Sequence, residues 1–245
     1  LSAQAEAEAA GLKALASSTL TGSLTGTSVA LVVLPGASDD DVSAIRSTLT
    51  DAGASVVGRV TLTDNCQSTS MSQYRTTLAT TLASHLESGA AKTASADGVV
   101  GYSILQVLTS TGAETDLLRQ ILTDKSTPLM TIDEDPAGKA TTVVAVGARA
   151  QAATSTQAAV AASSDAWIGL GLAVGSTSGV VVGDASSREA MISQIRTSGT
   201  AVTTVDSVGT TLASVDTALA LSTASNGARA YGVGNGAQSV IPSIK

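Results

Sequence analysis

The stretch 28-SVALVVLPGASDDDVSAIRSTLTDAGASVVGRVTL-62 decides the fold. It opens with a continuous apolar, β-branched run, which is typical of a central strand covered on both faces. A Pro-Gly pair ends that run, and Ser38 or Asp39 caps a helix whose apolar residues recur at helical spacing. A second apolar run, 55–62, completes the unit. Strand, helix and strand in this order predict a βαβ unit with a right-handed crossover.

Three more strand-like runs follow this unit. Most neighbouring runs are roughly 17 to 30 residues apart, which is room for one crossover helix. We therefore expect a single α/β domain over 21–245, with a doubly wound, mainly parallel five-stranded sheet of the flavodoxin-like or receiver-like kind. The later strands are expected at 141–147, 179–184 and 201–205, and the later helices at about 154–174, 186–196 and 210–223.

One gap breaks the rhythm, because about 80 residues separate the second strand from the third. We interpret 66–126 as a helical insertion that the sheet does not need, followed by a short edge strand at 128–132. Short helices need a packing partner, so the insertion either folds back on the sheet or projects as a hairpin that recruits another protein. Its three expected helices are marked by Met71, Tyr74, Leu78, Leu82 and Leu86, then by Tyr102, Leu105 and Leu108, and then by Leu117, Leu118, Ile121 and Leu122.

Composition excludes several classes of partner. The net charge is −7 and the 13 basic residues are scattered, which argues against nucleic acid and against docking on anionic lipid. A single cysteine excludes an intramolecular disulfide. No run approaches the roughly 20 apolar residues of a membrane helix. Because the chain opens at Leu1, we expect it to be a fragment, with 1–20 as the end of an N-terminal helix or coiled coil that could pair two copies.

The sequence offers little chemistry for catalysis or cofactors. His85 is the only imidazole, and no G-x-S-x-G elbow is present. Three acids after the first strand would repel a phosphate, and the glycines at 232, 234 and 236 match a nucleotide loop only weakly. We expect no enzyme activity and no cofactor. Cys66, Met71 and His85 are weak candidates for a soft-metal site.

Both ends of the domain resemble one known family. The segments 203-TTVD-206, 218-ALAL-221 and 231-YGVGNGA-237, together with VALVVLPG and DAGASVVGRVTLTD near the start, are similar to the actinobacterial family named for mycobacterial copper transport protein B (MctB). The resemblance implies a cell-envelope protein with an extracytoplasmic domain, anchored to the inner membrane by an N-terminal helix. The family name implies a role in copper homeostasis or transport.

The resemblance also implies a second role. Corynebacterial relatives look like cell-division partners that activate a peptidoglycan hydrolase of the NlpC/P60 endopeptidase type. An apolar stripe on the insertion would suit recognition between helices. On this hypothesis the partner-binding residues are Tyr74, Arg75, Leu78, Leu82, His85 and Leu86.

Overall fold

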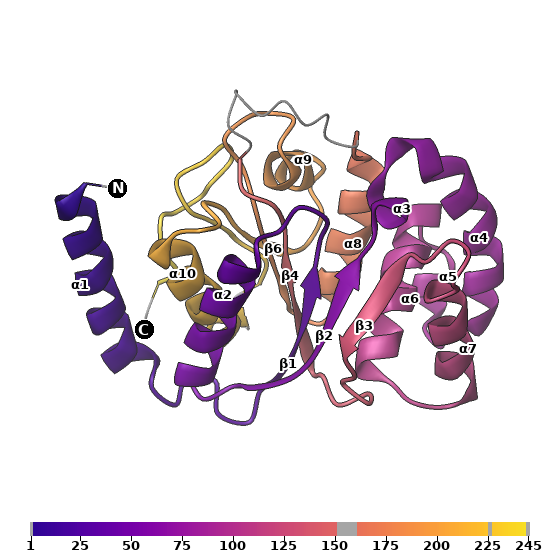
Figure 1. Ribbon diagram of the computed structural model, residues 1–245, viewed down its shortest axis with the longest axis horizontal. Helices are drawn as coiled ribbons and strands as arrows, with labels where there is room; N and C mark the ends of the chain where they lie inside the picture. The colour runs from indigo at the N-terminus through magenta and orange to yellow at the C-terminus, as the bar shows by residue number, and fades with distance from the viewer. Residues whose placement is uncertain (1, 151–160, 225–226, 244–245) are drawn as a thin grey trace.

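The computed structural model describes residues 2–150, 161–224 and 227–243 (Figure 1). The predicted βαβ unit is present as β1 (Ser28–Val33), α2 (Asp39–Asp51) and β2 (Ser55–Leu62). The other strands are β3 (Met130–Glu134), β4 (Thr142–Val146), β5 (Val180–Val182), β6 (Thr203–Val205) and β7 (Ala230–Tyr231). The other helices are α1 (Ala3–Leu20), α3 (Asp64–Gln67), the 3₁₀ helix η1 (Thr69–Met71), α4 (Ser72–His85), α5 (Gly89–Lys92), α6 (Ala96–Thr109), α7 (Ala113–Leu122), α8 (Ser164–Ser176), α9 (Met191–Thr197) and α10 (Thr211–Ser222).

Within the described residues the sheet is mixed and has seven strands in the order β3-β2-β1-β4-β5-β6-β7. Only β3 runs antiparallel to its neighbour. The α/β class and the mainly parallel sheet are thus confirmed, whereas the number of five strands is wrong. The five expected strands occupy the central places, the edge strand β3 lies beside β2, and β7 forms the other edge. The sequence did not predict β7 because its two residues, which precede a glycine, are too short a run to stand out as a strand.

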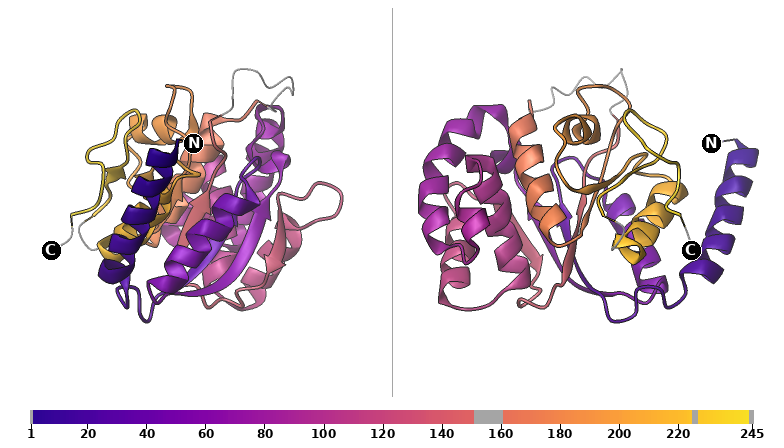
Figure 2. Two further views of the ribbon diagram at one scale, coloured as in Figure 1. Left: turned by 60° about the vertical axis from the view of Figure 1, so that its left-hand side comes forward. Right: turned by 180° about the vertical axis from the view of Figure 1, so that it is seen from behind.

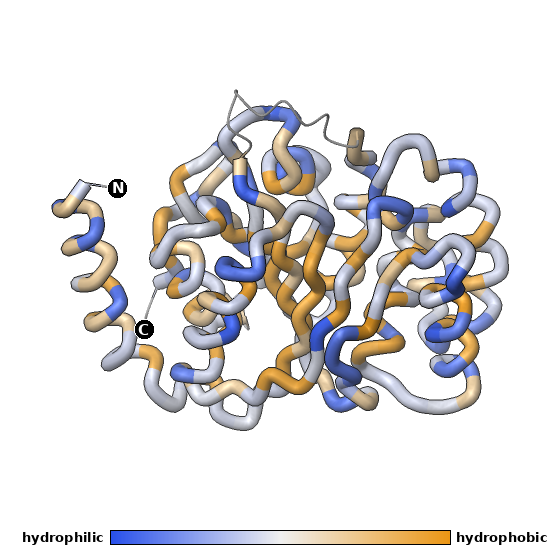
Figure 3. Tube along the Cα trace, viewed as in Figure 1, coloured by the Kyte–Doolittle hydropathy of each residue, from blue (hydrophilic) through white to orange (hydrophobic). Residues whose placement is uncertain are grey.

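Helices cover both faces of the sheet (Figure 2). Val29, Leu31 and Val33 of β1 point into a core shared with α1, α2 and α10. Ala30 and Val32, between them, point into a second core shared with α4, α6, α8 and α9. Successive side chains of a strand point to opposite faces, so a strand buried on both sides needs the unbroken apolar run seen in the sequence. Figure 3 shows the most apolar stretches gathered along these strands.

The insertion folds back on the sheet and supplies one of its covering helices. Of its helices, α6 is buried along nearly its whole length. It crosses α8 closely, because a Cβ on Gly101 would lie 2.6 Å from the carbonyl oxygen of Gly169. The expectation that the sheet does not need this segment is therefore wrong. The chain must cross from β2 to β4, on the far side of β1, and α6 covers the sheet along that crossover.

The helix expected at 154–174 is confirmed from Ser164 onward but not over 161–163. Residues 151–160 lie outside the described residues, and α8 begins only at Ser164, after Ser163 as N-cap. Before it, Ala162 forms an isolated bridge with Ser68. The segment before α8 is thus tied to the start of the insertion.

Acids paired with arginines line the β3 edge of the sheet. Glu134 and Arg46 of α2 form a two-pronged ion pair, with Arg46 Nη1 2.6 Å from Glu134 Oε1. The hydrogen bond from Arg46 holds the pKa of Glu134 below its usual value. On either side, Asp133 pairs with Arg59 at 3.3 Å and Asp135 pairs with Arg119 at 2.7 Å.

The N-terminal helix α1 stands at the side of the molecule and packs against α10 (Figure 1). Its contact with the body runs through Leu12, Ala16 and Leu20. Leu15, which the sequence placed on a coiled-coil stripe, is 71% exposed. None of the described helices is both long and apolar enough to cross a membrane.

Candidate functional site

The stripe predicted to bind a partner is mostly core. Leu82 is fully buried, Leu86 is 3% exposed, and Tyr74 and Leu78 are partly buried against the same cluster. The periodicity that predicted an amphipathic helix is confirmed, but its apolar face packs on α6 and α7. Leu82 and Leu86 therefore cannot meet a partner in this structure, which corrects their placement on a contact surface.

Arg75, the cation of that stripe, is a buried structural group. Its Nε lies 2.5 Å from Asp97 of α6, and its Nη1 donates to the carbonyl oxygens of Ser68 at 2.7 Å and Asn65 at 3.3 Å. The side chain is 0% exposed. Arg75 thus ties the turn before α4 to the start of α6 and is not available for recognition.

The three weak metal candidates do not come together. Cys66 is buried in α3, and burial raises the pKa of its thiol to about 12. Met71 and His85 stand at opposite ends of α4, about 21 Å apart at 1.5 Å per residue. His85 Nδ1 instead lies 2.6 Å from Glu114 Oε2. Among the described residues, no group of three or more His, Cys, Asp or Glu side chains is placed to hold a metal ion.

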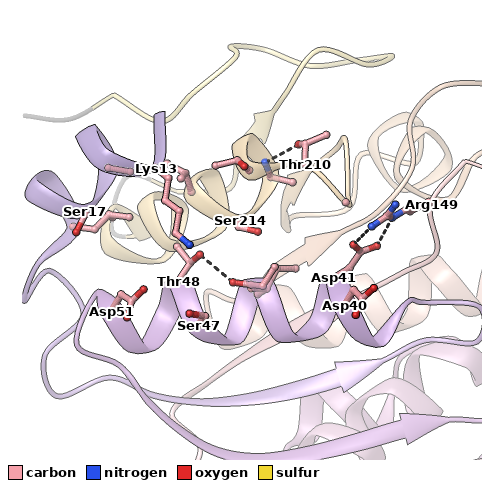
Figure 4. Close-up of a pocket in the computed structure, with 18 residues that line it drawn as sticks. Lys13, Ser17, Asp40, Asp41, Ser47, Thr48, Asp51, Arg149, Thr210 and Ser214 are labelled. Atoms are coloured by element: carbon pink, nitrogen blue, oxygen red, sulfur yellow. Dashed lines mark hydrogen bonds and ion pairs between the residues drawn. The ribbon is translucent and has the colours of Figure 1, made fainter. Parts of the chain in front are cut away.

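A groove on the opposite face of the sheet is a candidate site (Figure 4). It lies between α1, α2 and α10 and has a volume of about 300 Å³. Apolar groups from all three helices line it, among them Leu20, Ile45 and Val215. Its polar rim comprises Lys13 and Ser17 of α1, Asp40, Ser47, Thr48 and Asp51 of α2, and Thr210 and Ser214 of α10 and its cap.

Two of the helices that line the groove are capped, and an ion pair stands at one end of it. Ser38 caps α2 and Thr210 caps α10 through side-chain hydrogen bonds to backbone N–H groups. At the end near the carboxyl edge of the sheet, Arg149 Nε lies 2.7 Å from Asp41 Oδ2. This hydrogen bond raises the pKa of Arg149. The pair joins the loop after β4 to the start of α2, where an open α/β sheet changes direction and often binds ligands.

The chemistry of the groove suits recognition more than reaction. The described residues that line it include hydroxyls and carboxylates, but no histidine or cysteine is among them. A hydroxyl nucleophile would therefore lack a nearby imidazole base. What the groove offers is an apolar floor between three helices and charged groups along the rim, which is the form of a helix-binding site.

The glycine-rich segment near the C-terminus already holds an anion, and that anion is a side chain. Asp206, at the end of β6, accepts hydrogen bonds from the backbone N–H groups of Val233 and Gly234, both at 2.9 Å. Arg196 of α9 donates to it at 3.0 Å. Burial raises the pKa of Asp206, but the hydrogen bonds from Ser207, Val233 and Gly234 outweigh burial and leave the pKa below its usual value.

This arrangement explains the weak match to a nucleotide loop. Consecutive backbone N–H groups and a guanidinium form an anion-binding concavity, but here the Asp206 carboxylate fills it. Arg196 also donates to the carbonyl oxygens of Tyr231 and Asn235, both at 2.8 Å. Hydrogen bonds of the glycine-rich ending therefore join β6, α9 and the C-terminal segment; we call this set of contacts the Asp206 lock.

Asp216 of α10 is a second buried carboxyl that sequence reasoning missed. It is 0% exposed, and neither oxygen has a hydrogen-bond partner in the described part of the chain. Burial, and then the negative charge of Asp206, raise its pKa to about 7. An acid on an apolar helix was visible in the sequence, but only the packing shows that it is enclosed.

Comparison with known proteins identifies a family. The model of a family described as "Copper transport outer membrane protein, MctB" matches residues 1–242. A search of curated proteins found no match. The family match includes the glycine-rich ending and the βαβ unit that carried the resemblance in the sequence.

Proposed function

Because the chain belongs to the MctB family of copper transport outer membrane proteins, we propose that it is a non-enzymatic recognition domain of a copper-related envelope protein. The proposal places the domain outside the cytoplasm and gives it a protein partner. One observation carries it: the groove between α1, α2 and α10 is open, apolar at its floor and built by helices.

The structure favours recognition over direct copper chemistry in this domain. Copper(I) prefers thiolate, thioether and imidazole ligands. The one thiol is buried with a raised pKa, and the imidazole is at the far end of α4 from Met71. A groove lined by helices, in contrast, can accept the apolar face of another helix without any change in the core.

The partner we propose is a peptidoglycan hydrolase of the NlpC/P60 endopeptidase type, activated during cell separation. An inhibitory helix of such a hydrolase would lie in the groove. The domain would then hold this helix away from the hydrolase's own catalytic unit. This moves the contact surface from the buried stripe of α4 to the opposite face of the sheet.

The test is binding and activation of a purified NlpC/P60 hydrolase by the domain and by two serine variants. Ser17 lines the groove and Ser18, its neighbour on α1, does not; both are exposed. Ser17→Trp should fill the groove and reduce binding and activation at least about tenfold, a loss of about 1.4 kcal/mol. Ser18→Trp should behave as wild type. Equal binding by both variants, or no binding by the wild type, would contradict the proposal.

The family description favours a second candidate, in which the chain itself binds copper. This role predicts stoichiometric copper(I) binding by the reduced protein that is lost in Cys66→Ser. Calorimetry in the presence of a reductant measures it directly. Heat of binding at one equivalent would support the copper role, and its absence would leave recognition as the function of the domain.

A further inference from the structure

The groove described above has an acidic wall. Asp40 and Asp51 both line it from α2, both are exposed, and neither forms an ion pair with the described residues. Asp41, the third acid of the lining, is already neutralised by Arg149. Asp40 and Asp51 are therefore the two acids of the lining without an ion pair among the described residues, in a chain whose net charge is −7.

The spacing of these two acids is regular. They are 11 positions apart in a helix, so they stand about 17 Å apart along its axis. Eleven residues make just over three turns, which puts both carboxylates on the same face of α2. Figure 4 shows them toward opposite ends of the groove.

The chain itself supplies one cation to this wall. Lys13 is the only basic residue of α1, and its side chain reaches across the groove toward Thr48 of α2 (Figure 4). The lysine therefore lies over the stretch between the two acids. An amine is thus the kind of group that this wall accommodates.

We infer that the groove binds a cationic amphipathic helix of about three turns, whose apolar face enters between α1 and α2 and whose basic residues, about 11 positions apart, meet Asp40 and Asp51. The inference rests on the proposed function of the groove and specifies the chemistry of the partner. Lys13 competes with the partner for the same wall, so it weakens binding.

A synthetic helical peptide tests the inference without the hydrolase. The probe is a fluorescent amphipathic peptide of about 18 residues with leucines on one face and lysines about 11 positions apart; a second peptide has glutamates in place of the lysines. Fluorescence anisotropy at about 0.05 M and about 0.5 M NaCl measures affinity, because salt screens exposed charges. The wild type should bind the lysine peptide at least about tenfold more tightly than the glutamate peptide at low salt.

Variants of the domain complete the test. Asp40→Asn with Asp51→Asn should weaken the lysine peptide about tenfold, and Lys13→Gln should strengthen it. The matched control, Asp64→Asn with Asp165→Asn, makes the same change in net charge at exposed acids that lie outside the groove and form no ion pair with the described residues, and it should have no effect. Equal affinity for both peptides, or equal loss in the control, would overturn the inference.

The outcomes also separate this inference from the proposed function. Suppose that the hydrolase binds the wild type, that Ser17→Trp blocks this binding, and that Asp40→Asn with Asp51→Asn leaves it unchanged. This result would support the groove as the binding site and overturn its preference for a cationic partner. Binding of the lysine peptide with no binding of the hydrolase would support the charge preference and reject the proposed partner.

Discussion

The carboxylate of Asp206 lies where a side chain on Gly232 would be. A Cβ built on Gly232 would overlap both oxygens of Asp206, and the glycine has a φ of +123°, which L side chains rarely adopt. Position 232 therefore requires a glycine, because the loop passes directly over the Asp206 carboxylate. The carboxylate is held in turn because the loop points its backbone N–H groups toward it.

Loss of the Asp206 charge should destabilise the whole C-terminal edge. Asp206→Ala removes the acceptor of two backbone N–H groups and the anionic partner of Arg196, and breaking a buried ion pair typically costs about 3–5 kcal/mol. Urea unfolding of the wild type and the variant measures this loss in the free energy of unfolding. Formate or phosphate should restore part of the loss in Asp206→Ala, because the concavity is then free to bind an anion. Asp184→Ala, a less buried aspartate nearby, should cost less and show no rescue.

Replacement of Gly232 should cost more than replacement of a glycine with positive φ alone. Gly227 has a φ of +83°, and a Cβ there would meet nothing within 4 Å among the described residues. Gly227→Ala should cost about 1 kcal/mol, the usual penalty for the backbone. Gly232→Ala adds the collision with Asp206 and should lower the free energy of unfolding by about 3 kcal/mol or more. Equal losses in the two variants would show that the loop can relax.

Asp216 should make stability fall as pH rises toward neutrality. Its pKa is about 7 in the folded protein against 3.8 for the ordinary group, so the folded state binds the extra proton between those values. The stability it contributes is full below about pH 4 and is lost by about pH 7. Asp216→Asn should therefore be more stable than wild type at pH 8, by at most about 4 kcal/mol, and differ little at pH 4. Urea unfolding at both values checks this; a constant difference would contradict the assignment.

The α4 stripe should behave as core. Leu82→Ala removes a fully buried side chain and should cost about 2–5 kcal/mol. Leu117→Ala, also in the insertion but 39% exposed, should cost less than about 1 kcal/mol. Thermal and urea unfolding of the two variants give the comparison. A harmless Leu82→Ala would mean that the stripe is not packed as described.

Cys66 should be inert in the folded protein. Burial and a pKa of about 12 leave almost no thiolate at neutral pH, and the thiolate is the reactive species. A chromogenic disulfide reagent should therefore react with it only in denaturant. Fast reaction in the native state would show that the region around α3 opens readily.

The sequence predicted the central strands because their pattern is local. Each is a short apolar run bounded by turn residues, and a strand buried on both faces must look this way. The edge strand β7 was not predictable in this manner, because two residues hold no pattern. Its pairing depends on Arg196 and Asp206, which come from elsewhere in the chain.

The candidate site was harder to predict for a related reason. Periodicity showed that α4 has an apolar face but could not show whether that face meets the core or a partner. Burial of Arg75 depends on Asp97, 22 residues away, which no local pattern records. The groove is formed by α1, α2 and α10, which are far apart in sequence, so its lining became visible only in three dimensions.

The ion pairs along β3 have a consequence for crowding. An open strand edge invites a strand of another molecule, and a protein concentrated on a surface meets its neighbours often. Here an incoming strand would have to approach Asp133, Glu134 and Asp135 and disturb their arginines. At the other edge, the Asp206 lock keeps the C-terminal segment beside β7, where Ser239 forms an isolated β-bridge with Tyr231. Copies of this domain can therefore stand close together with little risk of joining their sheets.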